Sequence, residues 1–212
     1  MELSAGYWNE RYDNGNTGWD MQQVSPPLQA YFAQLRDKTC SILIPGCGNA
    51  YEAAWLQQEG FSSVTLADIS EVLTSGLRKK FGRPDSNIRV ITGDFFDLSG
   101  QYDLIVEQTF FCALDPSLRT RYVEKAFELL HPGGKLIGLL FDRDFVGASS
   151  LAPPCSFPSL CSGIPGGPPF GGHKEEYRLL LEKKLKIMTL APCYNSIRPR
   201  AGTELFFIAK RP

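Results

Sequence analysis

The chain has 212 residues, 43% of them hydrophobic, and a formal net charge of -1 at pH 7. This size and composition suit one domain, residues 1–212, with a sizeable core. The near-neutral charge argues against nucleic acid or an anionic membrane as the main partner. The sequence shows no targeting segment and no apolar run of about 18 residues, so we expect a cytoplasmic protein that does not contact a membrane. A monomer is the simplest expectation, with a homodimer as the alternative.

Cysteine and histidine usage gives little support to a metal site. The six cysteines include no Cys-x-x-Cys pair, and the chain has only two histidines. Zinc sites and disulfide frameworks both need closely spaced residues of these types. We therefore expect no metal ion and mostly reduced, buried thiols.

The first 40 residues are unusually aromatic. Residues 8–12 are predicted to form a helical turn with rings on one side, and residues 14–18 a loop that presents Trp19. One interpretation is a helix and loop that pack on a sheet as ordinary core. The other is a lid in which Trp8, Tyr12 and Trp19 close over a cationic ligand and exclude water, because aromatic faces attract cations.

A strand, a glycine turn and a helix follow. The apolar run Ser41–Ile44 is too short for a helix and precedes a proline, so it is predicted to be a buried strand. Gly46 and Gly48 form the turn. The helix that follows is predicted to be capped by Asn49 and ended by Gly60.

A second strand, residues 63–67, ends at Asp68. This acid lies about twenty residues past Gly48, where a nucleotide-binding βαβ unit places the carboxylate that holds two ribose hydroxyls. A dinucleotide fold also requires a small residue three positions after Gly48, close to the pyrophosphate. The bulky Tyr51 and the anionic Glu52 stand there instead, which favours S-adenosylmethionine as the ligand; a tight turn without a ligand is the alternative.

The third strand brings another acid to the same edge. Residues 71–81 are predicted to form a helix capped by Ser70, and Ile88–Thr92 a strand that leads to Asp94 and Phe95. A carboxylate there can accept from the adenine amine while the ring packs on the purine face. Ligands gather at the carboxyl ends of parallel strands, so we assign this pair to an adenine site. The alternative is an aspartate turn beside a core phenylalanine.

The fourth strand, residues 102–107, is predicted to bring Glu107 and Gln108 to the edge that carries the two earlier acids. A helix over residues 117–130 and a glycine-dependent turn at 131–134 then lead to a fifth strand over 135–141.

Residues 142–172 are rich in glycine and proline and show no periodicity. A loop of this length in a compact domain is usually functional or disordered. It leaves the end of the fifth strand, so we expect a substrate-side lid. A helix over 174–184 and strands over 185–190 and 204–209 follow, and this final hairpin is predicted to add an antiparallel edge to a parallel sheet.

Several ordered motifs resemble the thiopurine S-methyltransferase superfamily, in particular its thiol and halide methyltransferase branch. The motifs are the N-terminal aromatic stretch up to Trp19-Asp20, the loop 45–48, the run Phe-Phe-Cys-Ala-Leu at 110–114, the turn at 129–134 and Gly-Gly-Pro-Pro-Phe at 166–170. The resemblance covers nearly the whole chain. It implies an α/β fold of the Rossmann-like class I methyltransferase type, with a seven-stranded, mostly parallel sheet, one antiparallel edge hairpin, helices on both faces and an N-terminal aromatic lid.

Carried over by position, the resemblance implies S-adenosyl-L-methionine as cofactor and S-adenosyl-L-homocysteine as product. The implied cofactor contacts are Trp8, Tyr12, Trp19, Gly46, Gly48, Asp68, Ile69, Asp94, Phe95, Glu107 and Phe141. Tyr12 replaces a tryptophan of the family and Glu107 an aspartate, and both changes keep the chemical type. The segment 144–164 is longer than in plant relatives, so their substrates do not transfer directly.

The implied reaction is in-line attack by a small-molecule acceptor on the sulfonium methyl group. A thiol, thiopurine, sulfide or halide needs no general base, so alignment and desolvation are expected to suffice, without a catalytic residue. For a hydroxyl or amine acceptor, Asp142 or Tyr177 would be the base. The candidates for the substrate pocket, each with a core or surface role as its alternative, are Phe110, Phe111, Arg143, Arg198 and Arg200.

Functions from other classes stay open at this point. A nicotinamide-dependent oxidoreductase would share the strand, glycine turn and Asp68, although Tyr51 argues against it. A non-catalytic protein could keep the nucleoside pocket for regulation or assembly. An aminopropyl transferase is the weakest alternative, because no acidic pocket for a polyamine is evident.

Overall fold

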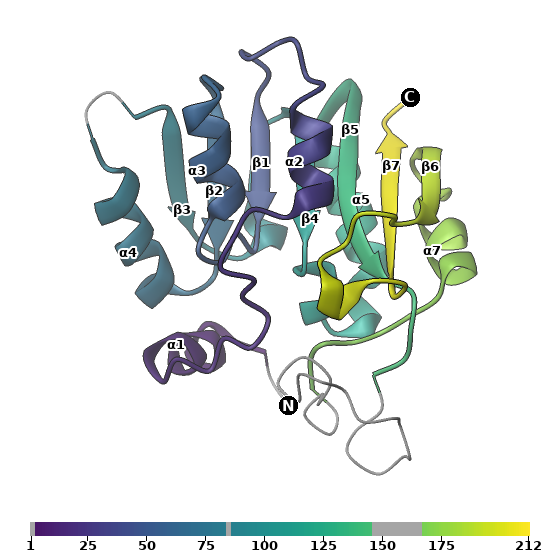
Figure 1. Cartoon of the computed structure of the whole chain (residues 1–212), viewed down its shortest axis with the longest axis horizontal. Helices are drawn as coiled ribbons and strands as arrows, with labels where there is room; N and C mark the ends of the chain where they lie inside the picture. Colours follow the sequence, from purple (N-terminus) through teal and green to yellow (C-terminus); the bar gives the residue numbers. More distant parts are fainter. Residues whose placement is uncertain (1–2, 84–85, 146–166) are drawn as a thin grey trace.

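The computed structural model describes residues 3–83, 86–145 and 167–212. A seven-stranded sheet in the order β3-β2-β1-β4-β5-β7-β6 forms its centre (Figure 1). The strands are β1 (Ile42–Pro45), β2 (Val64–Asp68), β3 (Ile88–Thr92), β4 (Tyr102–Gln108), β5 (Leu130–Phe141), β6 (Lys186–Pro192) and β7 (Glu204–Lys210). The helices are α1 (Ala5–Asp13), α2 (Pro26–Phe32), α3 (Tyr51–Gln58), α4 (Glu71–Phe81), α5 (Arg119–Leu129) and α7 (Lys174–Leu181). Single 3-10 turns are η1 (Phe95–Asp97), η2 (Phe111–Ala113), η3 (Pro116–Leu118) and η4 (Arg198–Arg200).

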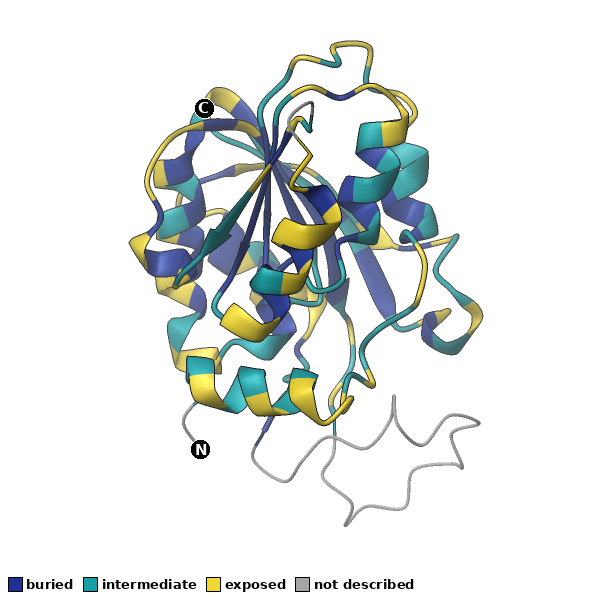
Figure 2. Ribbon diagram, turned by 90° about the vertical axis from the view of Figure 1, so that its left-hand side faces the viewer, coloured by how far each residue is buried: buried dark blue, intermediate teal, exposed yellow. Residues whose placement is uncertain are grey.

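Successive side chains along the strands belong in turn to two hydrophobic clusters, one on each face of the sheet. Leu43 and Ile105 belong to the cluster that α5 and α7 cover, whereas their neighbours Ile42 and Leu104 belong to the one that α2, α3 and α4 cover. Figure 2 shows the strands as a buried layer between the helices. This alternation follows from the two-residue period of a strand.

The strands β1 to β5 run parallel, and β7 pairs antiparallel with both β5 and β6. The predicted fold class is therefore confirmed, including the antiparallel hairpin at one edge. Because β1 to β5 are parallel, their carboxyl ends meet at one edge of the sheet, and α1 lies beyond that edge (Figure 1). This edge is where the lid and the acids were predicted to meet.

Most element boundaries agree with the sequence-based expectation, and α4 and β3 begin and end at the predicted residues. The cap of α3 was predicted wrongly. Its N-cap residue is Ala50, with φ of +54° and no side-chain cap, while the Asn49 amide donates to the Asp20 carboxylate at 2.6 Å. Helix α2, which covers the sheet with Leu28 and Phe32, was not predicted.

The expected turn at residues 131–134 lies within β5. The pairing shifts between Tyr102 opposite Leu130 and Leu104 opposite Lys135, so these four residues bulge out of the ladder. A Cβ on Gly134 would lie 3.0 Å from the Tyr102 carbonyl oxygen, which explains the requirement for glycine.

Within the described residues, four cysteines carry free thiols: Cys40, Cys47, Cys112 and Cys193. No group of three potential metal-ligating side chains occurs among the residues described. None of the described helices is long and apolar enough to cross a bilayer. The predicted loop at 142–172 falls mostly outside the described residues, which include only 142–145 and 167–172 of it.

Candidate active site

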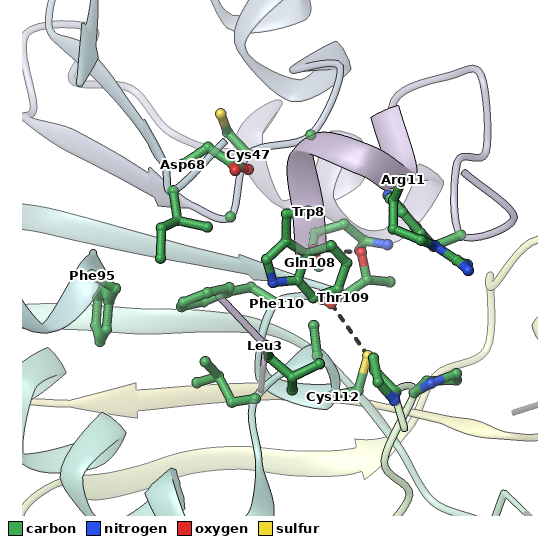
Figure 3. Close-up of a pocket in the computed structure, with 18 of the residues that line it drawn as sticks. Leu3, Trp8, Arg11, Cys47, Asp68, Phe95, Gln108, Thr109, Phe110 and Cys112 are labelled. Atoms are coloured by element: carbon green, nitrogen blue, oxygen red, sulfur yellow. Dashed lines mark hydrogen bonds between the residues drawn. The ribbon is translucent and has the colours of Figure 1, made fainter. Parts of the chain in front are cut away.

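A cavity of about 630 Å³ opens at the carboxyl ends of the parallel strands. Its floor is the sheet edge at β1, β2 and β4, and α1 with the loop after it forms the opposite wall. Figure 3 shows Asp68 and Phe95 toward one end and Cys112 toward the other. We refer to these as the Asp68 end and the Cys112 end. Among the described lining residues, carboxylates outnumber the two guanidinium groups, Arg11 and Arg200.

The glycine turn after β1 forms part of the floor. Gly46 and Gly48 have φ of +53° and +49°, a backbone region that favours glycine. A Cβ on Gly46 would overlap the ring of Phe110. The turn therefore packs directly on the segment that follows β4, which closes the floor between the two strands.

Asp68 ends β2 and lines the cavity with only 9% of its surface exposed. Burial raises the pKa of its carboxyl to about 6, although backbone N–H groups of Ser70, Gly48 and Ile69 lower it in part. Its Oδ1 accepts from the Ser70 N–H at 3.0 Å. A carboxylate has about four acceptor positions, so Asp68 can accept hydrogen bonds from a ligand besides those from its backbone donors.

Helix α1 is attached to this strand end through Asn9. Its Oδ1 accepts from the Ser70 hydroxyl at 2.8 Å and from the Val72 N–H at 3.3 Å, at the first turn of α4. The Ser70 hydroxyl also caps α4 by accepting from Leu73 N at 3.2 Å. Asn9 lies between Trp8 and Tyr12 in sequence, so this docking fixes the helix that carries both rings.

Three aromatic rings from the N-terminal segment line the cavity together. Trp19 packs edge-to-face on Trp8, with ring centroids 5.6 Å apart, and on Tyr12 at 5.8 Å. Burial and the nearby Asp68 raise the pKa of Tyr12 above its usual range, so its ring stays neutral. The structure thus brings the three predicted lid residues into one wall of the cavity.

Two side chains hold the Trp19 loop in place. The carboxylate of Asp20 accepts from Asn49 at 2.6 Å and from the Tyr51 hydroxyl at 3.2 Å, at the start of α3. From the other side, Arg200 donates to the Trp19 carbonyl at 2.9 Å. The loop is therefore fixed both to the glycine turn and to the segment before β7.

Asp94 and Phe95 follow β3 and both line the cavity. The Oδ1 of Asp94 accepts from the Phe96 N–H at 2.9 Å and so caps η1. Phe95 is 4% exposed, and its ring lies 5.4 Å from that of Phe110. Ile69 and Phe141, two further predicted contacts, also lie in the lining.

Four predicted site residues do not line the described cavity: Glu107, Phe111, Arg143 and Arg198. Glu107 falls on the α5 face of β4, like Ile105, because side chains alternate along a strand. Its carboxylate is fully buried, accepting from the backbone N–H groups of Phe110 and Phe111, each at 2.8 Å, and from Tyr122. Burial raises its pKa to about 7. Phe111 packs in the core, so its side chain does not face the cavity.

The three predicted substrate arginines lie in different surroundings. Arg198 is exposed, and Arg143 lies beside Phe145, both outside the lining of the described cavity. The reason is that both belong to surface segments, after β5 and before β7. Arg200 does line the cavity, but it is 3% exposed and is paired with Glu204 at 3.4 Å.

Sequence reasoning placed Gln108 at this edge without giving it a role. Its side-chain oxygen is buried in the cavity lining and has no partner in the described structure. The next residue, Thr109, has φ of +60°, an unusual and strained conformation for a β-branched residue. Cys112, Pro168 and Pro169 also line the Cys112 end. No sequence signal connected these residues, since they are distant along the chain.

Comparison with known proteins assigns the chain to a family. The model of the thiopurine S-methyltransferase family matches residues 3–159. The chain belongs to the thiopurine S-methyltransferase family. It is therefore an S-adenosylmethionine-dependent methyltransferase, which is the first of the functions that the sequence left open.

Family relatives match over most of the chain. The chain is 28% identical over 208 residues to the probable thiol methyltransferase 2 of Arabidopsis thaliana, covering 96% of this chain and 84% of that protein. It is 27% identical to the thiopurine S-methyltransferase of Vibrio cholerae over 169 residues, covering 72% and 76% of the two chains.

Solved structures match the fold at lower identity. The 1,6-didemethyltoxoflavin-N1-methyltransferase of Burkholderia thailandensis, solved with bound 1,6-didemethyltoxoflavin and S-adenosylhomocysteine, superposes with a TM-score of 0.71 at 18% identity. The match covers 98% of this chain and 86% of that one. This likeness supports the class I methyltransferase fold of the family member described here.

Proposed function

We propose that this methyltransferase transfers the methyl group of S-adenosylmethionine to a small soft nucleophile: a thiol, a thiopurine, sulfide or a halide. The observation that carries the proposal is the character of the Cys112 end of the cavity. Its described lining there is largely apolar, with Leu3, Leu114, Pro168 and Pro169, and neither candidate general base reaches it. A soft anion can attack a methyl group without such a base.

Both candidate bases are engaged elsewhere. Asp142 is exposed, and its Oδ1 accepts from the Lys174 N–H at 2.9 Å, where it faces the start of α7. Tyr177 is buried and donates its hydroxyl to the Phe141 carbonyl at 2.7 Å. Burial also raises the pKa of Tyr177, so it holds its proton. Neither of these two residues is therefore available as the general base that a hydroxyl or amine acceptor requires.

Two cavity thiols are poor nucleophiles themselves. Burial raises the pKa of Cys112 to about 12 and that of Cys47 well above its usual value. At neutral pH both are protonated, and the thiolate is the reactive form. The protein thiols in the lining therefore do not compete with an acceptor thiol.

The Asp68 end fits the adenosyl part of the cofactor. In this proposal the Asp68 carboxylate accepts from the two ribose hydroxyls, and Asp94 and Phe95 receive the adenine. The backbone at Gly46 and Gly48 approaches the ligand where a side chain would intrude. Asp68 and Asp94 supply the acceptors, and the rings supply the flat apolar surfaces that a nucleoside needs.

The aromatic wall fits the sulfonium centre. When bound, the cofactor supplies an electrophilic methyl group on a positively charged sulfur. The neutral rings of Trp8, Tyr12 and Trp19 attract such a cation without neutralising it. They also exclude water, which favours the meeting of an anionic nucleophile and a cation, because charge is lost along this reaction. In this proposal the side-chain oxygen of Gln108, which has no partner among the described residues, accepts from the ammonium group of the methionine tail.

A product assay tests the proposal. The purified protein is incubated with S-adenosylmethionine and, separately, with a thiopurine, an alkyl thiol, hydrosulfide, iodide, a phenol and an amine. We expect S-adenosylhomocysteine and methylated product, measured by mass spectrometry, with soft acceptors only. Methylation of the phenol or amine alone would refute the soft-nucleophile assignment. Size-exclusion chromatography of the same sample tests the accompanying proposal that the protein is a monomer.

A further inference from the structure

The wall at the Cys112 end includes a short returning segment, residues 167–172. Pro168 and Pro169 line the cavity, and the N–H of Phe170 donates to the Cys112 carbonyl at 2.7 Å. The N–H of Gly172 donates to the Arg143 carbonyl at 3.1 Å, and the two residues form an isolated bridge. The segment is therefore seated between the turn after β4 and the end of β5.

Arg119, the first residue of α5, reaches this segment from outside the cavity. Its Nη2 donates to the Gly171 carbonyl at 2.6 Å, and its Nη1 pairs with Glu176 Oε1 of α7 at 2.6 Å. The guanidinium lies 5.1 Å from the centroid of the Phe111 ring. Arg119 is 5% exposed and does not line the described cavity. The two terminal nitrogens of the Arg119 guanidinium, which we call the fork, thus connect α5, the returning segment and α7.

The fit of the returning segment is close. A Cβ on Gly171 would overlap the Arg143 carbonyl oxygen, and one on Gly172 would lie 2.5 Å from the Tyr177 hydroxyl. The backbone of Gly171 therefore lies directly between Arg143 and Arg119. Loss of the Arg119 hydrogen bond would leave a partly buried carbonyl without its donor, and a shift of the segment toward solvent would let water satisfy that carbonyl.

We propose that Arg119 is a positioning residue that holds the Pro168–Pro169 wall in place and thereby sets the affinity for the methyl acceptor. The ion pair alone does not explain the burial of Arg119, because the Glu176 side chain is 48% exposed, where ion pairs contribute little. The bond to Gly171, in contrast, acts on a segment that forms part of the cavity. The acceptor readout rests on the proposed function, whereas the position of the segment can be measured without it.

Hydrogen exchange at backbone amides measures how firmly the returning segment is held against its neighbours. The comparison is between the wild-type chain, Arg119→Lys, which keeps the charge but loses the fork, and Glu175→Gln as the matched control. Within the described part of the chain, the Glu175 side chain bonds only to Arg178, on the exposed face of α7. In Arg119→Lys we expect protection of the Phe170 and Gly172 amides to fall roughly tenfold, the scale of one hydrogen bond to a charged group. Amides of β1 and β2 and the control variant should keep wild-type protection. Unchanged protection at Phe170, or an equal loss throughout the chain, would overturn the inference.

Steady-state kinetics measure the consequence, with a thiopurine and hydrosulfide as probes. For Arg119→Lys we expect the KM of the thiopurine to rise roughly tenfold, from the same lost hydrogen bond, with kcat and the cofactor Kd unchanged. Hydrosulfide is too small to span the cavity, so its KM should change less. A parallel change of cofactor Kd and KM would indicate a general structural role and refute the proposal.

A second variant covers poor folding of the Arg119 substitution. Glu176→Ala removes one partner of the fork at a half-exposed position and should shift the same two readouts in the same direction by a smaller factor. If Glu176→Ala shifts both readouts as much as Arg119→Lys does, the ion pair and not the bond to Gly171 positions the segment, and the proposal is wrong. If the wild-type protein methylates neither probe, the proposed acceptor class fails, and hydrogen exchange still decides the positioning role of Arg119.

Discussion

At the Asp68 end of the cavity, the glycine turn and the acids come directly at the ends of strands, whereas the Cys112 end is assembled from distant parts of the chain. Gly46, Asp68 and Asp94 each come at or just after the carboxyl end of a strand. Cys112 and Pro168 are held together by one backbone hydrogen bond from Phe170. A site built from strand ends keeps its shape as long as the sheet is intact, and one built from segments depends on the contacts between them.

The variant Asp68→Ala sharpens this comparison most strongly. We expect cofactor affinity to fall by about 1–3 kcal/mol, because a ligand would lose a buried acceptor for its hydroxyls. Isothermal titration calorimetry with S-adenosylmethionine measures the change. The control is Asp97→Ala, since Asp97 is exposed and outside the lining. Wild-type affinity in Asp68→Ala would contradict the role given to the Asp68 end.

Glu107→Ala tests whether this carboxylate holds the backbone after β4 or binds the cofactor. We expect the free energy of unfolding to fall by about 1–3 kcal/mol, because two backbone N–H groups would lose their buried acceptor. Chemical denaturation measures the change. In Glu107→Gln one oxygen can still accept from both groups, so the loss should be smaller. A lower cofactor affinity in Glu107→Gln, with unchanged stability, would instead place Glu107 among the cofactor contacts.

The pH dependence of cofactor affinity tests the role of Asp68 without truncating its side chain. The ionised carboxylate is the better acceptor, and its pKa in the free protein is about 6. Affinity should therefore be constant above about pH 7 and fall toward about tenfold per pH unit below the pKa. Calorimetry at pH values on both sides of this pKa measures the affinity, and Asp68→Asn should remove the pH dependence. A wild-type curve that stays flat through pH 6 and below would separate Asp68 from the ligand.

The smallest effect is expected from Arg198→Ala, a residue that was predicted to contact the acceptor. Arg198 is exposed and outside the cavity lining, and substitutions at such positions usually change free energies by less than about 0.5 kcal/mol. The KM for a thiopurine should therefore stay near the wild-type value. A large rise in KM would return Arg198 to the acceptor site from which the structure removes it.

The sequence was sufficient to predict the sheet and most of the Asp68 end. Strand length, the glycine turn and the acids after successive strands are local features, and parallel strands bring such features to one edge. The lid rings were left with two interpretations, because spacing alone does not show what they face. In the structure they line the cavity, and Asn9 attaches their helix to α4.

The failures of the sequence-based prediction have physical causes. Glu107 was placed with the acids by its position in the chain, but the two-residue period of β4 turns it toward Tyr122. Asn49 has the side chain of a good N-cap, yet its tertiary bond to Asp20 competes with that role. Arg119 has no local signal at all, because its partners Gly171 and Glu176 lie more than 50 residues away, at separations of 52 and 57.

The place of β7 in the sheet has a consequence for folding. It is the last of the seven strands in chain order but lies between β5 and β6, and β6 pairs with no other described strand. Pairing of β7 with β5 must therefore precede the joining of β6 to the sheet. The segment that leads into β7 carries Arg200, so the same pairing brings its guanidinium to the Trp19 carbonyl and links the sheet edge to the aromatic wall.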